Sequence, residues 1–258
     1  MALSQKIIIL KKSKKVFKNW ITFPLSYFGL IKSNFIIFKT NSNKVLKIRK
    51  NSTDLMALVN VWLLEEYGHP NFTINSEDIV IDIGAHIGLY TVYASQFCTR
   101  GMIFSFEPIK ENYDLLKENI ELNNLKNAHL YNLAVSSDDG NVQLYLNNDQ
   151  AGHSKLSQTS KSVLVKSISL KKIFDENQID HCNLLKLDCE GSEYEIIRET
   201  PFEYLTKIDK IIIEYHMADS HPELLVELQT KLIHIFLLEI RSSFNGMGII
   251  YAQKIHSL

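Results

Sequence analysis

Short apolar runs alternate with segments of helical spacing from residue 79 to the end of the chain. Apolar runs bounded by glycine or by acids are typical of buried parallel strands. Such runs occupy residues 79–83, 102–106, 128–135, 183–187 and 208–214. Segments with helical apolar spacing follow most of them, as in Leu89, Val92, Tyr93 and Phe97. We therefore predict repeated strand–helix units, which fold as a doubly wound, mostly parallel α/β sheet.

Two further patterns predict hairpins. Residues 238–241 and 249–253 flank Asn245-Gly246, a dipeptide that favours a tight turn between antiparallel strands. Residues 142–146 and 163–165 alternate in polarity on either side of a polar loop, residues 147–161, which contains His153. We expect an antiparallel hairpin at the end of the sheet and an additional hairpin or edge strand between residues 140 and 175.

Helix starts are marked by proline and by capping residues. Pro108 stands where the first turn of a helix tolerates proline, and that helix continues through Tyr113, Leu116 and Ile120. Ser220-His221-Pro222-Glu223 has the spacing of a capping box with proline in the first turn.

The first 75 residues have a different pattern. Val16, Phe17, Trp20 and Ile21 recur at roughly helical spacing among lysines. An amphipathic helix of this kind either packs on the rest of the protein or lies on an anionic membrane surface. Residues 35–48 alternate as a small hairpin does, and residues 54–67 predict a helix with Leu58, Val61, Trp62 and Leu64 facing inward.

Composition changes this picture in one respect. The 258 residues have a net charge of −1, but the first fifty carry twelve lysines and arginines and no acid. A basic end on an acidic body suggests an anionic partner for that end. Cys98, Cys182 and Cys189 form no paired motif, and we find no secretory signal and no span-length apolar segment. We expect a cytoplasmic protein, peripheral to the membrane if the basic end binds one.

The residues with candidate chemistry follow the predicted strands. Asp82, Gly84, His86 and Gly88 lie between the first strand and its helix, and Glu107 ends the second strand. A glycine turn followed by an acid that can bind a ribose diol suits a nicotinamide dinucleotide or S-adenosylmethionine. The His86 side chain would obstruct a pyrophosphate, and acids at the strand ends suit a cationic ligand, so S-adenosylmethionine is favoured.

A second acidic group follows the strand at 183–187. Asp188 and Glu190 are crowded at one strand end, where one carboxylate could accept a proton. Glu193 is better explained as a helix cap. His216 ends the next strand and is a third candidate base, because its ordinary pKa lies near neutrality. We predict Asp188, Glu190 and His216 as catalytic residues and expect no metal.

Four segments together resemble the FkbM family of methyltransferases. They are Val80 to Gly88, Phe106-Glu107-Pro108 with Asn112, Asn132 to Val135, and Lys186 to Glu193, in the family's order and spacing between about residues 75 and 216. The resemblance implies a Rossmann-like seven-stranded fold, S-adenosylmethionine as cofactor, and O-methylation of sugars or polyketide-type natural products. Two positions depart from the family, since His86 stands where asparagine is usual and Cys189 where a small aliphatic residue is usual.

The resemblance also implies roles for residues. The cofactor would be held by Asp82, Gly84, His86, Gly88, Glu107, Ala134 and Asp188. In this set Glu107 binds the ribose, and the turn at Ala134, Val135 and Ser136 meets the adenine. We accordingly expect a basic extension over residues 1–75 (helix, hairpin, helix) and an S-adenosylmethionine-binding methyltransferase domain over residues 76–258.

Two other functions stay open at this point. A nucleic-acid methyltransferase would use residues 1–50 to bind phosphates. A non-catalytic adaptor would keep the fold and bind a partner or a lipid surface. The identity of the methyl acceptor and the oligomeric state have no signature in the chain, because a fold does not specify a substrate.

Overall fold

The computed structural model describes residues 3–145, 162–243 and 245–255. A seven-stranded sheet crosses the molecule in the order β11-β12-β10-β9-β3-β4-β5. Its strands are β3 (Ile79–Ile83), β4 (Met102–Phe106), β5 (Ala128–Tyr131), β9 (Leu184–Leu187), β10 (Lys210–Tyr215), β11 (Phe236–Ser242) and β12 (Gly248–Lys254). The five strands from β5 to β10 are parallel, and β12 is antiparallel to both β10 and β11. The predicted doubly wound sheet and its terminal antiparallel hairpin are confirmed.

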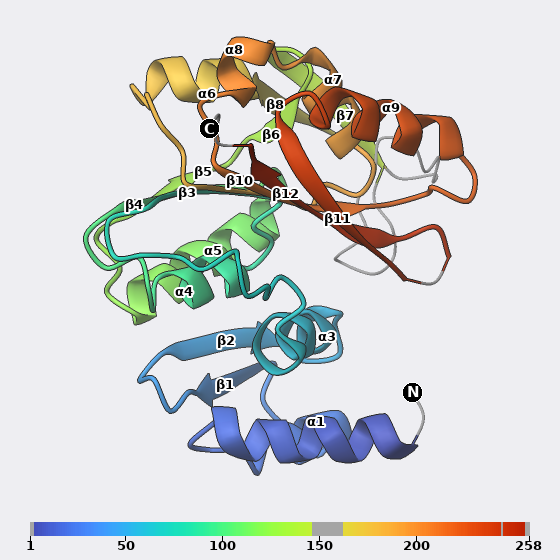
Figure 1. Cartoon of the computed structure of the whole chain (residues 1–258). Coiled ribbons are helices and arrows are strands. Elements are labelled where there is room, and N and C mark those ends of the chain that lie inside the picture. Colours follow the sequence, from blue (N-terminus) through green and yellow to red (C-terminus); the bar gives the residue numbers. More distant parts are fainter. Residues whose placement is uncertain (1–2, 146–161, 244, 256–258) are drawn as a thin grey trace.

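Helices cover both faces of this sheet (Figure 1). Helices α4 (Leu89–Ala94) and α5 (Lys110–Leu122) lie on one face. The other face carries α6 (Leu170–Glu176), α7 (Glu193–Glu199), α8 (Phe202–Leu205) and α9 (Pro222–Leu232). Alternate strand residues point to opposite faces. Val80 therefore packs in the core on the α4 side, whereas Ile81 and Ile83 pack in the core on the other side.

A three-stranded sheet lies beside the main one and corrects one prediction. Its order is β6-β8-β7, with β6 at Ala134–Ser136, β7 at Gly140–Tyr145 and β8 at Ser162–Ser169. The expected antiparallel hairpin between residues 140 and 175 is confirmed by β7 and β8. The single strand expected over 128–135 is wrong, because the chain leaves the main sheet after Tyr131 and joins β8 at Ala134. The polar loop with His153 lies outside the described residues.

Two predictions of helix starts are wrong in detail. Pro108 precedes α5, whose N-cap is Ile109, because Glu107 accepts the N–H of Ile109 and holds this segment extended. Helix α9 has His221 as N-cap without a side-chain cap bond, so Ser220 forms no capping box, although Pro222 occupies the first turn as expected.

The first 75 residues form a separate layer below α4 and α5 (Figure 1). They comprise α1 (Leu3–Val16), α2 (Thr22–Tyr27), the hairpin β1 (Phe35–Lys39) and β2 (Val45–Arg49), α3 (Asp54–Leu58) and the π-helix η1 (Val59–Leu64). The hairpin and the helix after it are confirmed. The helix ends earlier than predicted, and Leu64 is exposed rather than buried.

The basic helix is displaced from its predicted position. Helix α1 ends at Val16, so Phe17, Trp20 and Ile21 lie beyond it. Phe17 is fully buried against Phe38 and pairs as a β-bridge with Thr40. Within α1 the buried side chains are Ile9 and Ser13, one turn apart.

Asn119 of α5 and Asn123, the residue directly after α5, bind this layer to the sheet domain. Asn119 accepts the N–H of Lys47 and donates to its carbonyl, and Asn123 does the same with Val45. Residues four apart on a helix and two apart on a strand have nearly the same spacing, so the two amides act as a strand partner for β2. The edge of this small hairpin is thereby closed by a helix.

Candidate active site

A cavity of about 330 Å³ opens at the carboxyl ends of β3, β4, β9 and β10. In a doubly wound sheet this is where ligands bind, at the point where the strand order reverses. Five acids line it: Glu66, Glu107, Asp188, Glu190 and Glu214. A wall of the cavity comes from the first 75 residues, through Thr53, Met56, Ala57, Asn60 and Val61. The site is therefore built by both the expected extension and the sheet domain.

The turn after β3 depends on positive φ angles. Gly84 has φ +74°, and a Cβ there would lie 1.8 Å from the backbone oxygen of Asp188. His86 has φ 51°, a conformation that histidine tolerates better than most residues. At Gly88, φ +82°, a Cβ would meet Leu116 Cδ1 at 2.4 Å. Glycine at the first and third of these positions lets the loop approach the end of β9 and lets α4 pack on α5.

Asp82 does not line the cavity. Its side chain is fully buried and shares a face of β3 with Val80, so it points toward α4. There it accepts a hydrogen bond from Thr91 Oγ1 at 2.7 Å. Its other oxygen, Oδ1, accepts no hydrogen bond of good geometry but lies 3.2 Å from Lys186 Nζ. Asp82 and Gly88 were both predicted to hold the cofactor, but neither lines the cavity. They can affect cofactor binding only through the shape of the turn after β3.

Lys186 is the cation beneath the site. It is the cross-strand neighbour of Asp82, and its Nζ donates to the carbonyl of Gly84 at 2.9 Å. It also lies 3.5 Å from Asp188 Oδ2. Burial alone would lower the pKa of Lys186, but Asp82 and Asp188 raise it well above its ordinary value. The ammonium stays charged and compensates the two carboxylates beside it.

Glu107 holds the two segments that would enclose a ribose. Its Oε2 accepts the N–H of His86 and its Oε1 that of Ile109, each at 2.9 Å. Burial raises the pKa of Glu107 to about 7, although these hydrogen bonds act in the opposite direction. Oε1 also accepts from Asn112 Nδ2 at 3.4 Å, whereas Oε2 has a second lone pair that can accept a hydroxyl from the cavity side.

His86 lies against a polar cluster from the N-terminal layer. Its Nε2 is 3.2 Å from Arg49 Nη2 and 3.5 Å from Asp54 Oδ1. Arg49 also donates to Asp54 and Asn112. Burial lowers the pKa of His86 to about 4, so the imidazole is neutral at physiological pH. The predicted cofactor residue is thus fixed in place by residues 49 and 54.

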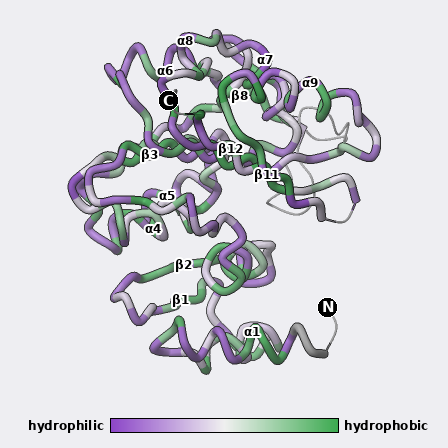
Figure 2. The backbone as a smooth tube through the Cα atoms, in the orientation of Figure 1, coloured by the Kyte–Doolittle hydropathy of each residue, from purple (hydrophilic) through white to green (hydrophobic). Residues whose placement is uncertain are grey.

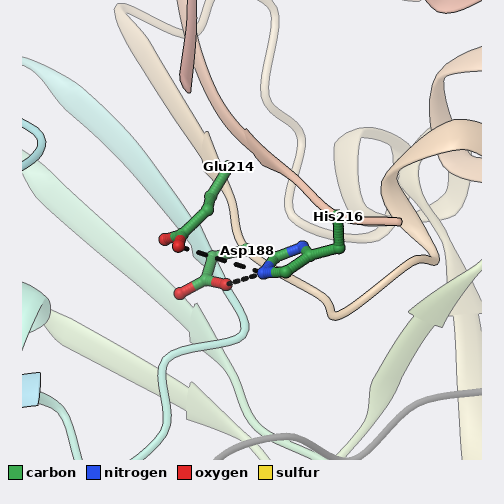
Figure 3. A group of neighbouring side chains, drawn as sticks. All are labelled: Asp188, Glu214 and His216. Carbon is green, nitrogen blue, oxygen red and sulfur yellow. Dashed lines mark ion pairs between the residues drawn. The ribbon is translucent and has the colours of Figure 1, made fainter. Parts of the chain in front are cut away.

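The ends of β9 and β10 carry the densest group of titratable side chains. Asp188, Glu214 and His216 point toward one another there (Figure 3). Tyr67, from the N-terminal layer, joins the two acids, because its hydroxyl lies 2.9 Å from Asp188 Oδ2 and 2.7 Å from Glu214 Oε2.

Burial, Asp188 and Glu66 raise the pKa of Glu214 to about 8. Burial works against ionisation of Asp188 too, but Lys186 and His216 outweigh it and lower its pKa. Asp188 is therefore ionised at neutral pH and Glu214 mostly protonated.

His216 is almost fully buried behind these acids. Its Nδ1 lies 3.1 Å from Glu193 Oε1, and its Nε2 lies 3.7 Å from Glu190 Oε2 and 3.9 Å from Asp188 Oδ1. Burial alone would lower its pKa, but the hydrogen bond to Glu193 and the charges of Glu193, Glu190 and Asp188 raise it to about 10. At neutral pH the ring is an imidazolium, which cannot accept a proton. This charge state makes the neighbouring carboxylates better candidates for the base than His216, and the choice of base stays a proposal.

Glu193 does more than the predicted helix cap. Its Oε2 accepts the N–H of Gly191 just before α7, and its Oε1 accepts the N–H of His216. This fully buried carboxylate therefore links the ends of β9 and β10.

The group in Figure 3 also has the donor set of a cation site. One ligand atom from each of Asp188, Glu214 and His216 lies within 4.8 Å of the others. An imidazolium is not a metal ligand, so His216 would first have to lose its proton. The expectation of no metal stays a prediction.

The residues predicted to meet the adenine lie partly in the cavity, and two other cavity residues were not predicted. Ala134 and Val135 line the cavity as predicted, together with Leu144 of the β7–β8 hairpin, whereas Ser136 does not. Tyr67 and Glu66 were missed. No local pattern marks them, because they lie about 120 residues before the acids they face.

The cavity fits S-adenosylmethionine chemically. Its lining holds five acids, of which Glu214 is mostly protonated at neutral pH, and one charged lysine, so the carboxylates outnumber the cation and favour a cationic ligand such as a sulfonium. Glu107 lies at the strand end where an acid binds a ribose diol. Sheet order, glycine turn and acidic cavity together define a class I S-adenosylmethionine-dependent methyltransferase.

The family follows from the sequence match. Residues 82–234 match the family described as Methyltransferase FkbM domain, and the chain belongs to this family. The predicted resemblance, fold and cofactor are thereby confirmed. The roles of Ala134, Asp188 and the other predicted residues in binding the cofactor stay proposals.

Two curated relatives and one solved structure are similar. The chain is 25% identical to Methyltransferase 1 of Beauveria bassiana, over 56% of this chain and 66% of that protein. It is 26% identical to hexuronic acid methyltransferase AglP of Haloferax volcanii, over 54% of this chain and 56% of that protein. The match thus spans about two thirds or less of either relative. The structure of M. jannaschii TYW2 in complex with AdoMet is 18% identical, with TM-score 0.47, over 87% of this chain and 89% of that one.

Proposed function

We propose that this protein transfers a methyl group from S-adenosylmethionine to a hydroxyl of a sugar or a related small molecule. The observation that carries the proposal is the pair of acids, Asp188 and Glu190, that face the cavity beside the buried imidazolium of His216. A similar protein, AglP, is named for methylation of a hexuronic acid. The proposal takes the same acceptor class for this chain.

The bound cofactor supplies an electrophilic methyl carbon. A carboxylate of the protein would accept the proton that the acceptor hydroxyl loses when its oxygen takes the methyl group. Alignment contributes most of the rate of such a displacement, and a positioned base typically adds about 10²–10⁴-fold.

We assign the proton to Glu190 or Asp188. Both face the cavity and both lie beside His216 Nε2. The pKa of Asp188 is lowered and its carboxylate already accepts from Tyr67, and both effects reduce its strength as a base. His216 acts as a positioning residue in this scheme, because its charge orients the two carboxylates.

The wall formed by residues 53–61 is the proposed acceptor side. These residues belong to the N-terminal layer, whereas the predicted cofactor residues belong to the sheet domain. We therefore keep the predicted boundary near residue 75 as a proposal: the sheet domain binds cofactor, and the preceding layer contributes to acceptor choice.

The test has a binding arm and a transfer arm. Isothermal titration should detect S-adenosylhomocysteine and not NAD. Methyl transfer from labelled S-adenosylmethionine should then be assayed with hexuronic acids, neutral hexoses and simple alcohols. Binding without transfer to any hydroxyl acceptor would contradict the O-methylation proposal, and absence of binding by folded protein would favour the adaptor function.

Glu190→Gln separates catalysis from binding. We expect kcat to fall about 100-fold or more, with the Kd for S-adenosylhomocysteine nearly unchanged. Glu195→Gln on α7 is the matched control, since it alters an acid of the same helix region that does not line the cavity. Unchanged kcat in Glu190→Gln would assign the proton to Asp188.

A further inference from the structure

An exposed surface at the far end of the N-terminal layer combines apolar side chains with lysines. We define the basic apolar face by Ile7, Ile8 and Leu10 of α1 and by Tyr27, Phe28 and Leu30 at and after the end of α2, all exposed. Phe28 is 70% and Leu30 66% exposed. Several large apolar side chains exposed at one end of a protein mark a candidate interaction site.

The orientation of α1 is set by its buried side. Ile9 and Ser13 are buried toward the N-terminal layer, so the opposite side of the helix points outward. That side carries Ile7 and Ile8 in its first half and Lys11, Lys14 and Lys15 in its second half. Figure 2 shows hydrophobic and hydrophilic stretches alternating along α1, at the end of the molecule away from the main sheet.

The end of α2 lies beside α1. Lys6 of α1 lies over the ring of Tyr27 at 5.6 Å, and Tyr27 contacts Phe28 edge to face. These contacts place the exposed residues at the end of α2 and those of α1 at the same end of the N-terminal layer. No ion pair among the described residues involves the lysines at positions 6, 11, 14 and 15, and the first acid in the chain is Asp54.

We propose that the basic apolar face docks on an anionic lipid bilayer, with its apolar side chains entering the interface and its lysines contacting lipid headgroups. Interfacial binding requires both components, because apolar burial and attraction to anionic lipid add together. Each lysine near such a surface contributes to the attraction, and the contribution falls away within a Debye length.

A second copy of the chain is a poorer occupant of this face. Two copies would bring the lysines of α1 from both chains together, with no acid in the first fifty residues to compensate them. No helix of the described residues is long and apolar enough to cross a membrane, so the proposed contact is with the surface of the bilayer.

The experiment is cosedimentation of the full chain with vesicles. Phosphatidylcholine vesicles containing about 30% phosphatidylglycerol should bind the protein, pure phosphatidylcholine vesicles should bind at least about tenfold less, and about 0.5 M NaCl should release it. Lys11→Glu with Lys15→Glu, and separately Phe28→Ser with Leu30→Ser, should each weaken binding about tenfold or more.

Matched controls test the location of the contact. Val226→Ser with Leu237→Ser removes two side chains that are 62% and 66% exposed elsewhere on the protein, and Lys166→Glu with Lys171→Glu reverses two exposed lysines far from α1. Both controls should bind like the unaltered protein. S-adenosylhomocysteine affinity, measured in parallel, should be the same in all four variants and reports that they are folded.

Three results would overturn the proposal. They are no binding of folded protein to anionic vesicles, equal losses in control and test variants, and salt-sensitive binding to RNA without binding to vesicles. The last would identify the face as a nucleic-acid surface. Each result is independent of whether the protein methylates a sugar.

Discussion

Tyr67→Phe should destabilise the protein more than the same change elsewhere in the core, and increasingly so as the pH rises. The hydroxyl of Tyr67 is buried between Asp188 and Glu214, at 2.9 and 2.7 Å. Tyr251 is the control, because it too is buried and its hydroxyl donates to the neutral backbone carbonyl of Glu66 at 2.8 Å.

The magnitudes follow from the acceptors. A hydrogen bond to a charged group contributes about 1.5–3 kcal/mol, and one between neutral groups about 0.5–1.5 kcal/mol. One hydroxyl proton can serve only one of the two acids at a time. We therefore expect a loss of about 2 kcal/mol in the free energy of unfolding for Tyr67→Phe and about 1 kcal/mol for Tyr251→Phe.

The pH dependence comes from Glu214. Its pKa is raised from 4.5 to about 8 in the folded state, so its contribution to stability is complete below pH 4.5 and is lost as the pH rises through about 8. The hydrogen bond from Tyr67 lowers this pKa and so reduces the loss. Without the hydroxyl the pKa rises further, and the difference between variant and wild type widens from about pH 6 to about pH 9.

Urea unfolding at these two pH values, followed by tryptophan fluorescence, measures the effect. Wild type, Tyr67→Phe and Tyr251→Phe are compared under the same conditions. If Tyr67→Phe loses no more stability than Tyr251→Phe at the higher pH, or loses the same at both pH values, the charged hydrogen bond does not exist as described.

Three other predictions concern the turn, the ribose site and the layer contact. Gly84→Ala should lower the melting temperature far more than Gly29→Ala, because both have φ near +70° but only the first would place a Cβ 1.8 Å from a backbone oxygen. Binding of S-adenosylhomocysteine should tighten as the pH rises toward about 7 and then level off, because a ribose diol donates to ionised Glu107, whose pKa is about 7. Glu107→Gln should weaken binding about tenfold or more and abolish the pH dependence of the Kd. A pH-independent Kd in wild type would refute the assignment of Glu107 to the ribose. Asn119→Ala should lower the free energy of unfolding, measured in urea, by about 2–3 kcal/mol, because it leaves three backbone groups on β2 and before α4 without hydrogen-bond partners. A loss under about 0.5 kcal/mol would show that water replaces the Asn119 side chain as their partner.

Much of the sheet domain could be predicted from local pattern. Buried strands are uniformly apolar. The run that contains Asp82 stops directly before Gly84, and this pattern predicts a tight turn at that point. The positive φ at Gly84 and Gly88 and the position of Glu107 at the end of β4 agree with that expectation. The family resemblance rests on these same residues and is confirmed by the match over residues 82–234.

The errors in the fold come from competition between elements. Residues 128–135 have one continuous apolar pattern, yet they divide between two sheets, since the edge of β8 offers Ala134 a partner that the main sheet does not. Phe17 was expected on a helix but is buried and forms a β-bridge with Thr40, directly after β1. Periodicity records which side chains avoid water and does not record which edge receives them.

The sequence by itself determined which residues stand at the strand ends, because alternation, glycine and proline act over a few neighbours. Only the tertiary structure decided how those residues are charged. It placed Tyr67 between two acids more than a hundred residues away, turned Asp82 toward α4, and enclosed His216 among carboxylates so that it keeps its proton. A pKa depends on burial and on charges within a few ångströms, and these are set by contacts between segments distant in the chain.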